Sequence, residues 1–585
     1  MNELDPITFS VIWGGLLSTA AEMGATLEKT AYSVVVREGS DFSTGIFNAD
    51  GQMVAQGDHS PGHLGSMAFT VGRVLEHYPL SSLRDGDAII CNDPGIGSGH
   101  LPDVFMVTPV FNDERLIGYT VNIAHHADVG GSSAGGQQIV GISETYHEGL
   151  RLTPIKLFDA GVEREDVFRL IRGNVRVEDV LGDLRAQYAA NLTGAAKLKG
   201  LAARYGADVL AAASGEIISR TEKAMRAALS KLPNGTYRFT DFVDDTGPDT
   251  DPVRLELALH IEDGFATFDW NGTSDARPAG INCYLSYTTA YCLCALKAAT
   301  DPTTPQNQGT LNCLQVKAPE GSYLNPRPNS ASGGRAINSH RIYECVMGAL
   351  AQIVPERVIA ANSHFFNTNI GGPRHPRTSK PFVAWDIVVG GVGAQFNRDG
   401  QEATSSPFNG TNIPVESQEI SNPVLVERVS LIPDSAGPGR YRGGMAMRKD
   451  VRILADEATL YNLGDRHKFS PYGLSGGCAG IRAKTILNPD TAHERALSSK
   501  GTYHLKLNDV ISWQTSGAGG NGHSFERSPA AVLDDVLNGL VTVEHARTAY
   551  GVVIATDPMR LDEAATRKTR ECARIAAGAT EREAR

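Results

Sequence analysis

Residues 87–111 read DAIICNDPGIGSGHLPDVFMVTPVF, and this stretch decides how the first part of the chain is organised. Two apolar runs flank residues 92–103, whose glycines and prolines exclude a helix or a regular strand. The pattern therefore predicts a strand, a loop and a second strand. The loop ends in His100-x-x-Asp103, which can place both side chains on one metal ion, with Pro102 stiffening the spacer. The same residues also suit an ordinary surface turn, and spacing alone leaves both interpretations open.

Histidines and carboxylates gather in the same quarter of the sequence. We expect the histidines to lie in loops or at strand ends, where functional side chains are common. Neutral imidazole and carboxylate oxygen are suitable ligands for a divalent metal. The candidates near the loop are Glu38, Asp41, His59, His63, His125 and His126.

Periodicity assigns the elements around the loop. Asp5 and Pro6 begin a helix whose apolar residues recur at helical spacing to about residue 31. SVVV (33–36) reads as a strand, and FSTGIFNADGQMVAQ (42–56) as two strands around a turn. GDHSPGHLGSM (57–67) reads as a loop that leads into a helix, MAFTVGRVLEHY. Three strands follow: DAIICND, VFMVTPVF and LIGYTVNIAHH.

The rest of the chain changes character several times. Residues 160–233 have helical periodicity, residues 234–275 alternate as strands, and residues 380–525 combine glycine and proline with short strands. Helical blocks are expected at about 283–301, in RIYECVMGALAQIV, and in two helices between Ser528-Pro529 and Gly551. Because helices and strands do not alternate strictly, we expect a mixed α+β, multi-layer chain and not a simple doubly wound sheet.

The bulk composition narrows the class of protein. The 585 residues carry a formal net charge of -12, which disfavours non-specific nucleic-acid binding. No window has 18 uninterrupted apolar residues, and the acids of MNELDPITF do not suit a signal peptide. The eight cysteines form no C-x-x-C pair, and Cys292 and Cys294 read as helical, so we expect buried, reduced thiols. These features indicate a cytoplasmic protein without a membrane or nucleic-acid partner.

Two glycine motifs have the composition of binding loops. Residues 517–522 fit G-x-G-x-x-G, but no helix opens directly after them, so a flexible turn is favoured. Ser332-Gly333-Gly334-Arg335 precedes a helix and could bind an anion through its amides, or could be a tight connection. There is no G-x-x-x-x-G-K-[ST] loop, so nothing in the sequence indicates ATP binding by this chain.

Longer motifs connect these features to a known family. REGSDFSTGIFNADGQMVAQGDHSPGHLGSM, NDPGIGSGHLPD and NIAHHADVGG resemble the hydantoinase B/oxoprolinase family. The resemblance continues in EGLRLTPIKLF, GDLRAQYAAN, PGRYRGGM and ERSPAAVLDDVLNGLVTVEHARTAYGVVI. It implies a hydantoinase B-like catalytic region over residues 1–555 and a helical tail over 556–585. Within that region we expect a metal-site segment (about 1–160), a helical segment (160–233), a β-rich segment (234–525) and a helical hairpin (526–555).

The resemblance also implies site residues and cofactors. The metal ligands carried over are His100, Asp103 and His125, with Glu38 or Asp41 as the fourth ligand. His59, His63 and His126 are then expected beside the ligands or the substrate, and with Glu38 they are the candidate catalytic groups. Mixed nitrogen and oxygen ligands suit Zn²⁺, Mn²⁺ or Fe²⁺ about equally.

The resemblance implies an activity that requires two subunits. A hydantoinase A-type partner would bind ATP and Mg²⁺ and phosphorylate the oxygen of a small cyclic amide. This chain would then complete ring opening with a metal-activated water, in an (AB)2 heterotetramer. The family that the chain resembles also includes subunits of ATP-dependent acetone and acetophenone carboxylases. The alternative function is therefore that of a subunit of an ATP-dependent ketone carboxylase.

Overall fold

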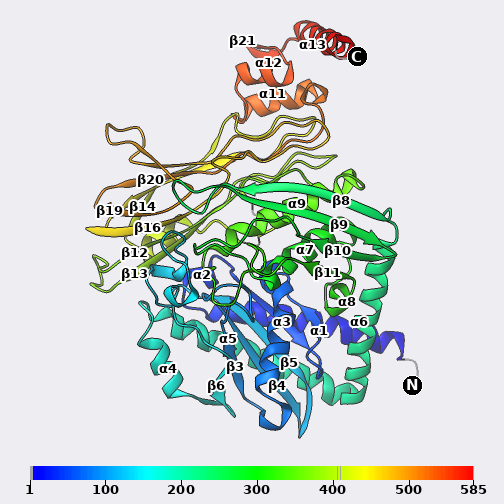
Figure 1. The fold of residues 1–585 in the computed structure, drawn as a ribbon, viewed down its shortest axis with the longest axis vertical. Coiled ribbons are helices and arrows are strands. Elements are labelled where there is room, and N and C mark those ends of the chain that lie inside the picture. The colour runs from blue at the N-terminus through cyan, green and yellow to red at the C-terminus, as the bar shows by residue number, and fades with distance from the viewer. Residues whose placement is uncertain (1–3, 405, 409, 584–585) are drawn as a thin grey trace.

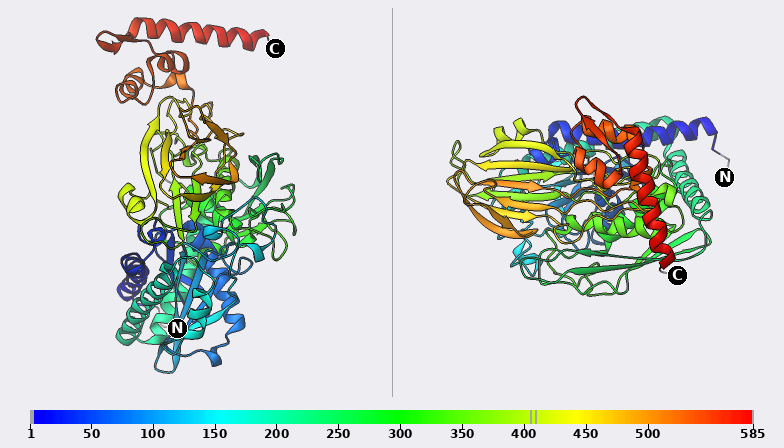
Figure 2. Two further views of the ribbon diagram at one scale, coloured as in Figure 1. Left: turned by 90° about the vertical axis from the view of Figure 1, so that its left-hand side faces the viewer. Right: turned by 90° about the horizontal axis from the view of Figure 1, so that it is seen from above.

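The computed structural model describes residues 4–404, 406–408 and 410–583. The chain forms an elongated body (Figures 1 and 2). Helices and a large sheet lie at one end, two further sheets at the other, and the C-terminal helices project beyond those sheets. The helices are α1 (Pro6–Thr30), α2 (Val34–Arg37), α3 (Pro61–His77), α4 (Glu165–Arg172), α5 (Asp179–Tyr205), α6 (Ala207–Leu229), α7 (Leu285–Thr300), α8 (Gln308–Leu311), α9 (Asn338–Leu350), α10 (Val415–Ser421), α11 (Pro529–Leu537), α12 (Val543–Tyr550) and α13 (Glu563–Glu583).

The N-terminal part is built on a seven-stranded antiparallel sheet of order β2-β1-β5-β4-β3-β6-β7. Side chains alternate along its strands, so one face packs against α1 and α5 and the other against α3. The predicted strands on both sides of the 92–103 loop are confirmed as β3 and β4. The strands are β1 (Phe42–Phe47), β2 (Met53–Gln56), β3 (Ala88–Cys91), β4 (Asp103–Asn112), β5 (Arg115–His125), β6 (Ile155–Asp159) and β7 (Val162–Glu163).

The strand predicted for residues 33–36 is wrong, because Val34–Arg37 forms the short helix α2. The Ser33 hydroxyl accepts a hydrogen bond from the Val36 amide, and the Asp183 carboxylate accepts from the amides of Tyr32 and Ser33. These capping contacts come partly from distant α5, so tertiary structure overrides the strand propensity of three valines.

The loop predicted for His63 is also wrong, because α3 begins at Pro61 and not at Met67. Ser60 and Pro61 form a common helix start. The glycines that weaken the helical pattern are required by packing: a Cβ on Gly62 would lie 2.5 Å from the Tyr287 ring, and one on Gly65 would lie 2.5 Å from Ala290. Close approach of α3 to α7 therefore places His63 on the first helical turn.

A second, four-stranded sheet of order β11-β10-β9-β8 covers the far side of α7 and α9. The main core cluster fills this layer and includes Trp270, Tyr287 and Tyr291. The strands are β8 (Gly235–Val243), β9 (Val253–Glu262), β10 (Phe265–Asp269) and β11 (Leu314–Lys317).

Two more sheets face each other as a sandwich, of orders β13-β12-β16-β19 and β14-β15-β20-β17-β18. Phe366 and Ile370 of β12 point into the sandwich core with Trp513. The alternate residues of β12 and β13 point out of the sandwich, towards the N-terminal sheet. The strands are β12 (Phe366–Gly372), β13 (Phe382–Val388), β14 (Val424–Ile432), β15 (Ala446–Ile453), β16 (Glu457–Leu463), β17 (Lys484–Leu487), β18 (Arg495–Leu497), β19 (Lys500–Lys506) and β20 (Val510–Gln514).

The C-terminal part contains α11 and α12, a small hairpin of β21 (Ile554–Thr556) and β22 (Met559–Leu561), and α13. Gly551 adopts the left-handed conformation expected of a helix C-cap.

No helix opens at residues 517–522, which agrees with the predicted turn. Together these features confirm the mixed α+β, multi-layer fold. None of the helices among the described residues combines the length and the apolar composition of a transmembrane span.

Candidate metal centre

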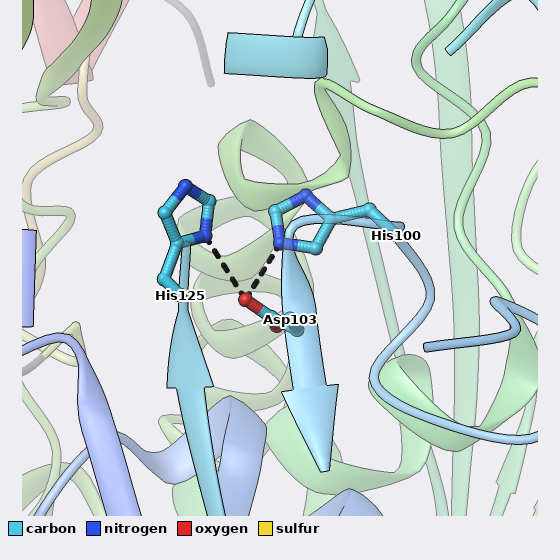
Figure 3. A group of neighbouring side chains, drawn as sticks. All are labelled: His100, Asp103 and His125. Atoms are coloured by element: carbon cyan, nitrogen blue, oxygen red, sulfur yellow. Dashed lines mark hydrogen bonds and ion pairs between the residues drawn. The ribbon is translucent and has the colours of Figure 1, made fainter. Parts of the chain in front are cut away.

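Three strand ends converge on one buried point. Asp103 is the first residue of β4 and His125 the last of β5, and the two are direct partners in the sheet register. Asp41 immediately precedes β1, and its carbonyl accepts a hydrogen bond from the His125 amide at 2.9 Å. The 92–103 loop returns His100 over the same point (Figure 3). The antiparallel register therefore brings together residues that are far apart in the sequence.

His100, Asp103 and His125 form the centre of this group. Asp103 Oδ1 lies 2.9 Å from His100 Nε2 and 3.0 Å from His125 Nδ1. One ligand atom from each residue lies within 4.8 Å of the other two. All three side chains are buried, so the group is shielded from bulk water.

Asp41 and His63 complete the group. Asp41 Oδ2 lies 3.8 Å from His125 Nδ1, and its Oδ1 lies 3.5 Å from His63 Nε2. His63 Nε2 is also 3.2 Å from Asp103 Oδ2. Burial opposes a charge on His63, but the carboxylates of Asp103 and Asp41 outweigh it and raise the pKa of His63. His63 therefore lies where it can exchange a proton with the centre of the group.

Arg335 contacts Asp103 and stabilises its negative charge. Its guanidinium pairs with Asp103 Oδ2, donates to the Ser98 carbonyl at 2.8 Å, and lies over the Tyr287 ring at 3.8 Å. The Ser98 hydroxyl also donates to Asp103 Oδ2. Burial alone would raise the pKa of Asp103, but His100, Arg335 and His63 hold it well below its usual range. Asp103 is therefore an ionised carboxylate inside the fold.

Polar groups lie beside the rings of the two candidate histidine ligands, His100 and His125. His100 Nδ1 lies 2.9 Å from the Gly333 carbonyl, an arrangement that protonates Nδ1 and leaves a lone pair on Nε2. Burial, and then Arg335, lower the pKa of His100 to about 4, which favours the neutral ring. Gln137 Nε2 lies 3.5 Å from His125 Nε2, and Gln137 accepts a hydrogen bond from Asn369 of β12.

The Ser332–Arg335 motif binds a carboxyl group of the chain itself. The amides of Ser332 and Gly333 donate to Glu148 Oε1 at 2.6 and 2.5 Å. Burial raises the pKa of Glu148 to about 8. The loop that supplies the Gly333 carbonyl and Arg335 is thus held by an internal carboxyl group.

Three predicted site residues lie outside the group. The Glu38 side chain is partly exposed and pairs with Arg37. The His59 ring lies against Phe42, with ring centroids 4.5 Å apart, and burial lowers its pKa to about 4. His126 Nε2 lies 3.0 Å from Gln187 of α5, and burial lowers its pKa as well.

Sequence reasoning missed the residues that support the group but lie far from it in the sequence. Arg335 and Glu148 are separated from Asp103 by more than two hundred and by about forty positions, respectively. The Ser332–Arg335 motif is the available signal for Arg335. Glu148 is the first residue of the motif EGLRLTPIKLF, but nothing in the sequence indicates that it or Gln137 supports the site, because their role depends on neighbours that only folding supplies.

The donor set is suitable for a divalent metal ion. Asp41 Oδ1 and His100 Nε2 are buried, and neither has a hydrogen bond of regular geometry with a described residue, although they lie 3.5 Å from His63 Nε2 and 2.9 Å from Asp103 Oδ1. Buried polar atoms normally have a partner, and two such atoms beside a carboxylate and a second imidazole are what a metal site requires. The residues present therefore fit the metal that the resemblance implies.

Comparisons with known proteins identify the family of this chain. A sequence profile described as hydantoinase B/oxoprolinase matches residues 5–524. This chain belongs to the hydantoinase B/oxoprolinase family.

Individual relatives span nearly the whole chain. A putative D-/L-hydantoinase B subunit of Pseudomonas sp. (strain NS671) is 32% identical over 98% of this chain and 99% of its own length. The beta subunit of the caprolactamase of Pseudomonas jessenii is 32% identical over 97% and 99%.

Two solved structures share the fold. A crystal structure of the ATP-dependent caprolactamase of P. jessenii superposes with a TM-score of 0.89 at 30% identity, covering 97% of this chain and 100% of that one. A nucleotide-free acetone carboxylase structure has a TM-score of 0.90 at 20% identity, covering 99% of this chain and 84% of that one, and shows the fold alone.

Proposed function

We propose that this chain is the metal-binding subunit of an ATP-dependent cyclic-amide hydrolase, which opens a lactam or hydantoin ring. The single observation that carries the proposal is the buried His100, Asp103 and His125 group, with Asp41 beside it. The relatives named as hydantoinase, caprolactamase and 5-oxoprolinase support the reaction class.

Ring opening of an unstrained amide needs activation, which we assign to a partner subunit. A hydantoinase A-type ATPase would hold ATP and Mg²⁺ and phosphorylate the amide oxygen. The names of the hydantoinase and caprolactamase relatives, each of which denotes one subunit of an enzyme, support such a partner. An (AB)2 heterotetramer is part of the same proposal.

Asp41, His100, Asp103 and His125 would hold a divalent ion, Zn²⁺, Mn²⁺ or Fe²⁺, because mixed nitrogen and oxygen ligands suit all three. Such an ion supplies Lewis acidity, which lowers the pKa of water towards about 7. Of the two candidate carboxylates, Asp41 is favoured over Glu38 because only Asp41 lies within 4 Å of His125 and His63.

The other residues have distinct tasks in this proposal. His63 accepts the proton of the attacking water, since its Nε2 faces both Asp41 and Asp103. Arg335 keeps Asp103 ionised and oriented. The Gly333 carbonyl fixes the ring of His100. Burial of the group excludes bulk water from the reacting carbon.

Metal content and reconstituted turnover test the proposal together. His100→Ala and His125→Ala should each lower metal affinity at least about tenfold, measured by metal analysis after dialysis against a buffered ion, while circular dichroism stays unchanged. Wild-type chain mixed with the partner ATPase, ATP and Mg²⁺ should convert a cyclic amide to its ring-opened acid, with or without bicarbonate. Turnover of ketones alone, and only with bicarbonate, would instead establish the carboxylase alternative.

A further inference from the structure

A charged cleft lies close to the candidate metal centre, outside the group described above. Its volume is about 740 Å³, within the range of small-molecule sites. One wall consists of residues 32–35 and 176–179, and the other of residues 375–385 and 420–422. Figure 1 shows α2, from the first wall, beside the ends of β12 and β13.

The two walls carry opposite charges. Arg377 and Lys380 extend from the second wall, both are exposed, and neither forms an ion pair with a described carboxylate. Arg377 is held by the Glu419 and Ile420 carbonyls near the end of α10. The cleft therefore offers fixed positive charge on one side.

Glu178 and Asp179 provide negative charge on the first wall, at the N-terminus of α5. Partial burial and the neighbouring Asp183 carboxylate raise the pKa of Asp179, so a cation in the cleft would favour the charged form of this group. Both side chains are exposed, and no described cation lies within ion-pairing distance of either. Arg176, also on this wall, is already paired with Asp128. The acids are therefore available to a cation in the cleft.

Trp385 connects the cleft to the candidate metal centre. Its side chain lines the cleft, yet only 4% of it is exposed, and its indole Nε1 has no hydrogen-bond partner among the described residues. The same ring lies 6.2 Å, centroid to centroid, from the His125 ring. A ligand in the cleft is thus separated from the candidate metal ligands by one side chain.

We propose that this cleft binds a zwitterionic ω-amino acid, the ring-opened product of a simple lactam. Its carboxylate would lie at Arg377 and Lys380, its ammonium at Glu178 and Asp179, and its methylene chain between the two walls. This inference rests on the proposed function and narrows its substrate class. Opening a simple lactam produces a free ammonium and a carboxylate, whereas opening a hydantoin leaves a neutral ureido group that the acidic wall would not attract.

Matched ligands test the charge pattern on the full-length chain. 6-Aminohexanoate, hexanoate, hexylamine and 6-ureidohexanoate would be titrated by calorimetry at one ionic strength. We expect 6-aminohexanoate to bind at least about tenfold more tightly than each of the other three, a difference of about 1.4 kcal/mol. Equal affinity for hexanoate or 6-ureidohexanoate would overturn the proposal.

Two double variants test which wall binds the carboxylate and which binds the ammonium of the ligand. Arg377→Gln/Lys380→Gln should weaken 6-aminohexanoate binding at least about tenfold and leave hexylamine binding unchanged. Glu178→Gln/Asp179→Asn should weaken it similarly and leave hexanoate binding unchanged. Lys231→Gln/Arg238→Gln, which removes two exposed cations outside the cleft lining, should bind 6-aminohexanoate as the wild type does. Unchanged binding in both cleft variants would also overturn the proposal.

The assembled enzyme separates this inference from the proposed function. If it opens lactams but 6-aminohexanoate inhibits wild type and cleft variants equally, the cleft assignment fails while the function stands. If 6-aminohexanoate binds with the expected charge dependence but no cyclic amide is opened, the proposed function fails and the cleft remains an amino-acid site.

Discussion

At the scale of single residues, the site depends on which carboxylate reaches the strand ends. Glu38 and Asp41 are three positions apart in REGSD and are equivalent in sequence terms. In the fold, Glu38 follows the last turn of α2 and pairs with Arg37, while Asp41 immediately precedes β1 and its Oδ2 lies 3.8 Å from His125 Nδ1. The short helix that forms in place of the predicted strand makes this difference.

Asp41→Asn should therefore lower the affinity for a divalent ion at least about tenfold, because it removes a charged oxygen donor. Glu38→Gln is the matched control and should bind the ion as the wild type does. Competition with a chromogenic chelator measures both. A loss in Glu38→Gln alone would exclude Asp41 as the ligand, and equal losses in the two variants would contradict the preference for Asp41 over Glu38.

Glu148 gives a prediction with a definite pH dependence. Its pKa is about 8 in the fold against 4.5 for an ordinary glutamate, so the fold binds its proton more tightly. Its contribution to stability is thus full below about pH 4.5 and is lost as the pH rises to about 8. Glu148→Gln keeps an acceptor for the Ser332 and Gly333 amides and cannot ionise. Urea unfolding should show the stability of Glu148→Gln rising relative to wild type between about pH 5 and 8; a constant difference would contradict the assignment.

At the scale of elements, α3 shows how packing decides a helix start. Glycine disfavours a helix, yet Gly62 and Gly65 lie on the turns where α3 meets α7. Gly62 and Gly65 are therefore required by the contact between α3 and α7, which local helix propensity alone does not predict. His63 is carried into the candidate metal centre by this contact.

Gly65→Ala should destabilise the chain by about 1–3 kcal/mol, because its methyl group would lie 2.5 Å from Ala290. Gly72→Ala is a control in the same helix: its added methyl group would have no atom within 4 Å and the residue is exposed, so it should stabilise by about 0.5–1 kcal/mol. Chemical denaturation measures both changes. A Gly65→Ala variant as stable as Gly72→Ala would show that α3 and α7 can separate without cost.

At the scale of the whole molecule, a buried charge network joins the layers. Arg341 of α9 donates to Asp465, which follows β16, at 2.6 Å, and Lys500 of β19 lies 3.0 Å from the same carboxylate. Arg466 reaches Asp241 of β8 at 2.9 Å. The network therefore connects the β8–β11 sheet and α9 to the sandwich, and so fixes β12 and β13 over the candidate metal centre.

Arg341→Met should destabilise the fold by about 3–5 kcal/mol, because it leaves Asp465 and Glu344 buried with less compensating charge. Arg220→Met breaks an exposed pair with Glu216 on α6 and should change stability by less than about 1 kcal/mol. Thermal unfolding of both variants tests the contrast. Similar effects would show that the network does not join the layers energetically.

Local sequence patterns predict the family, the mixed α+β class, the strands around residues 92–103 and three residues of the candidate metal centre, His100, Asp103 and His125. These features follow from local patterns: alternation, turn residues and long contiguous motifs. Tertiary structure alone decided that residues 34–37 are helical, that His63 lies on α3, that Asp41 and not Glu38 faces His125, and that Arg335 and Glu148 support the group. The physical reason is that each of these depends on contacts between segments far apart in the chain, such as Asp183 with Ser33 or Ala290 with Gly65, which no local pattern contains.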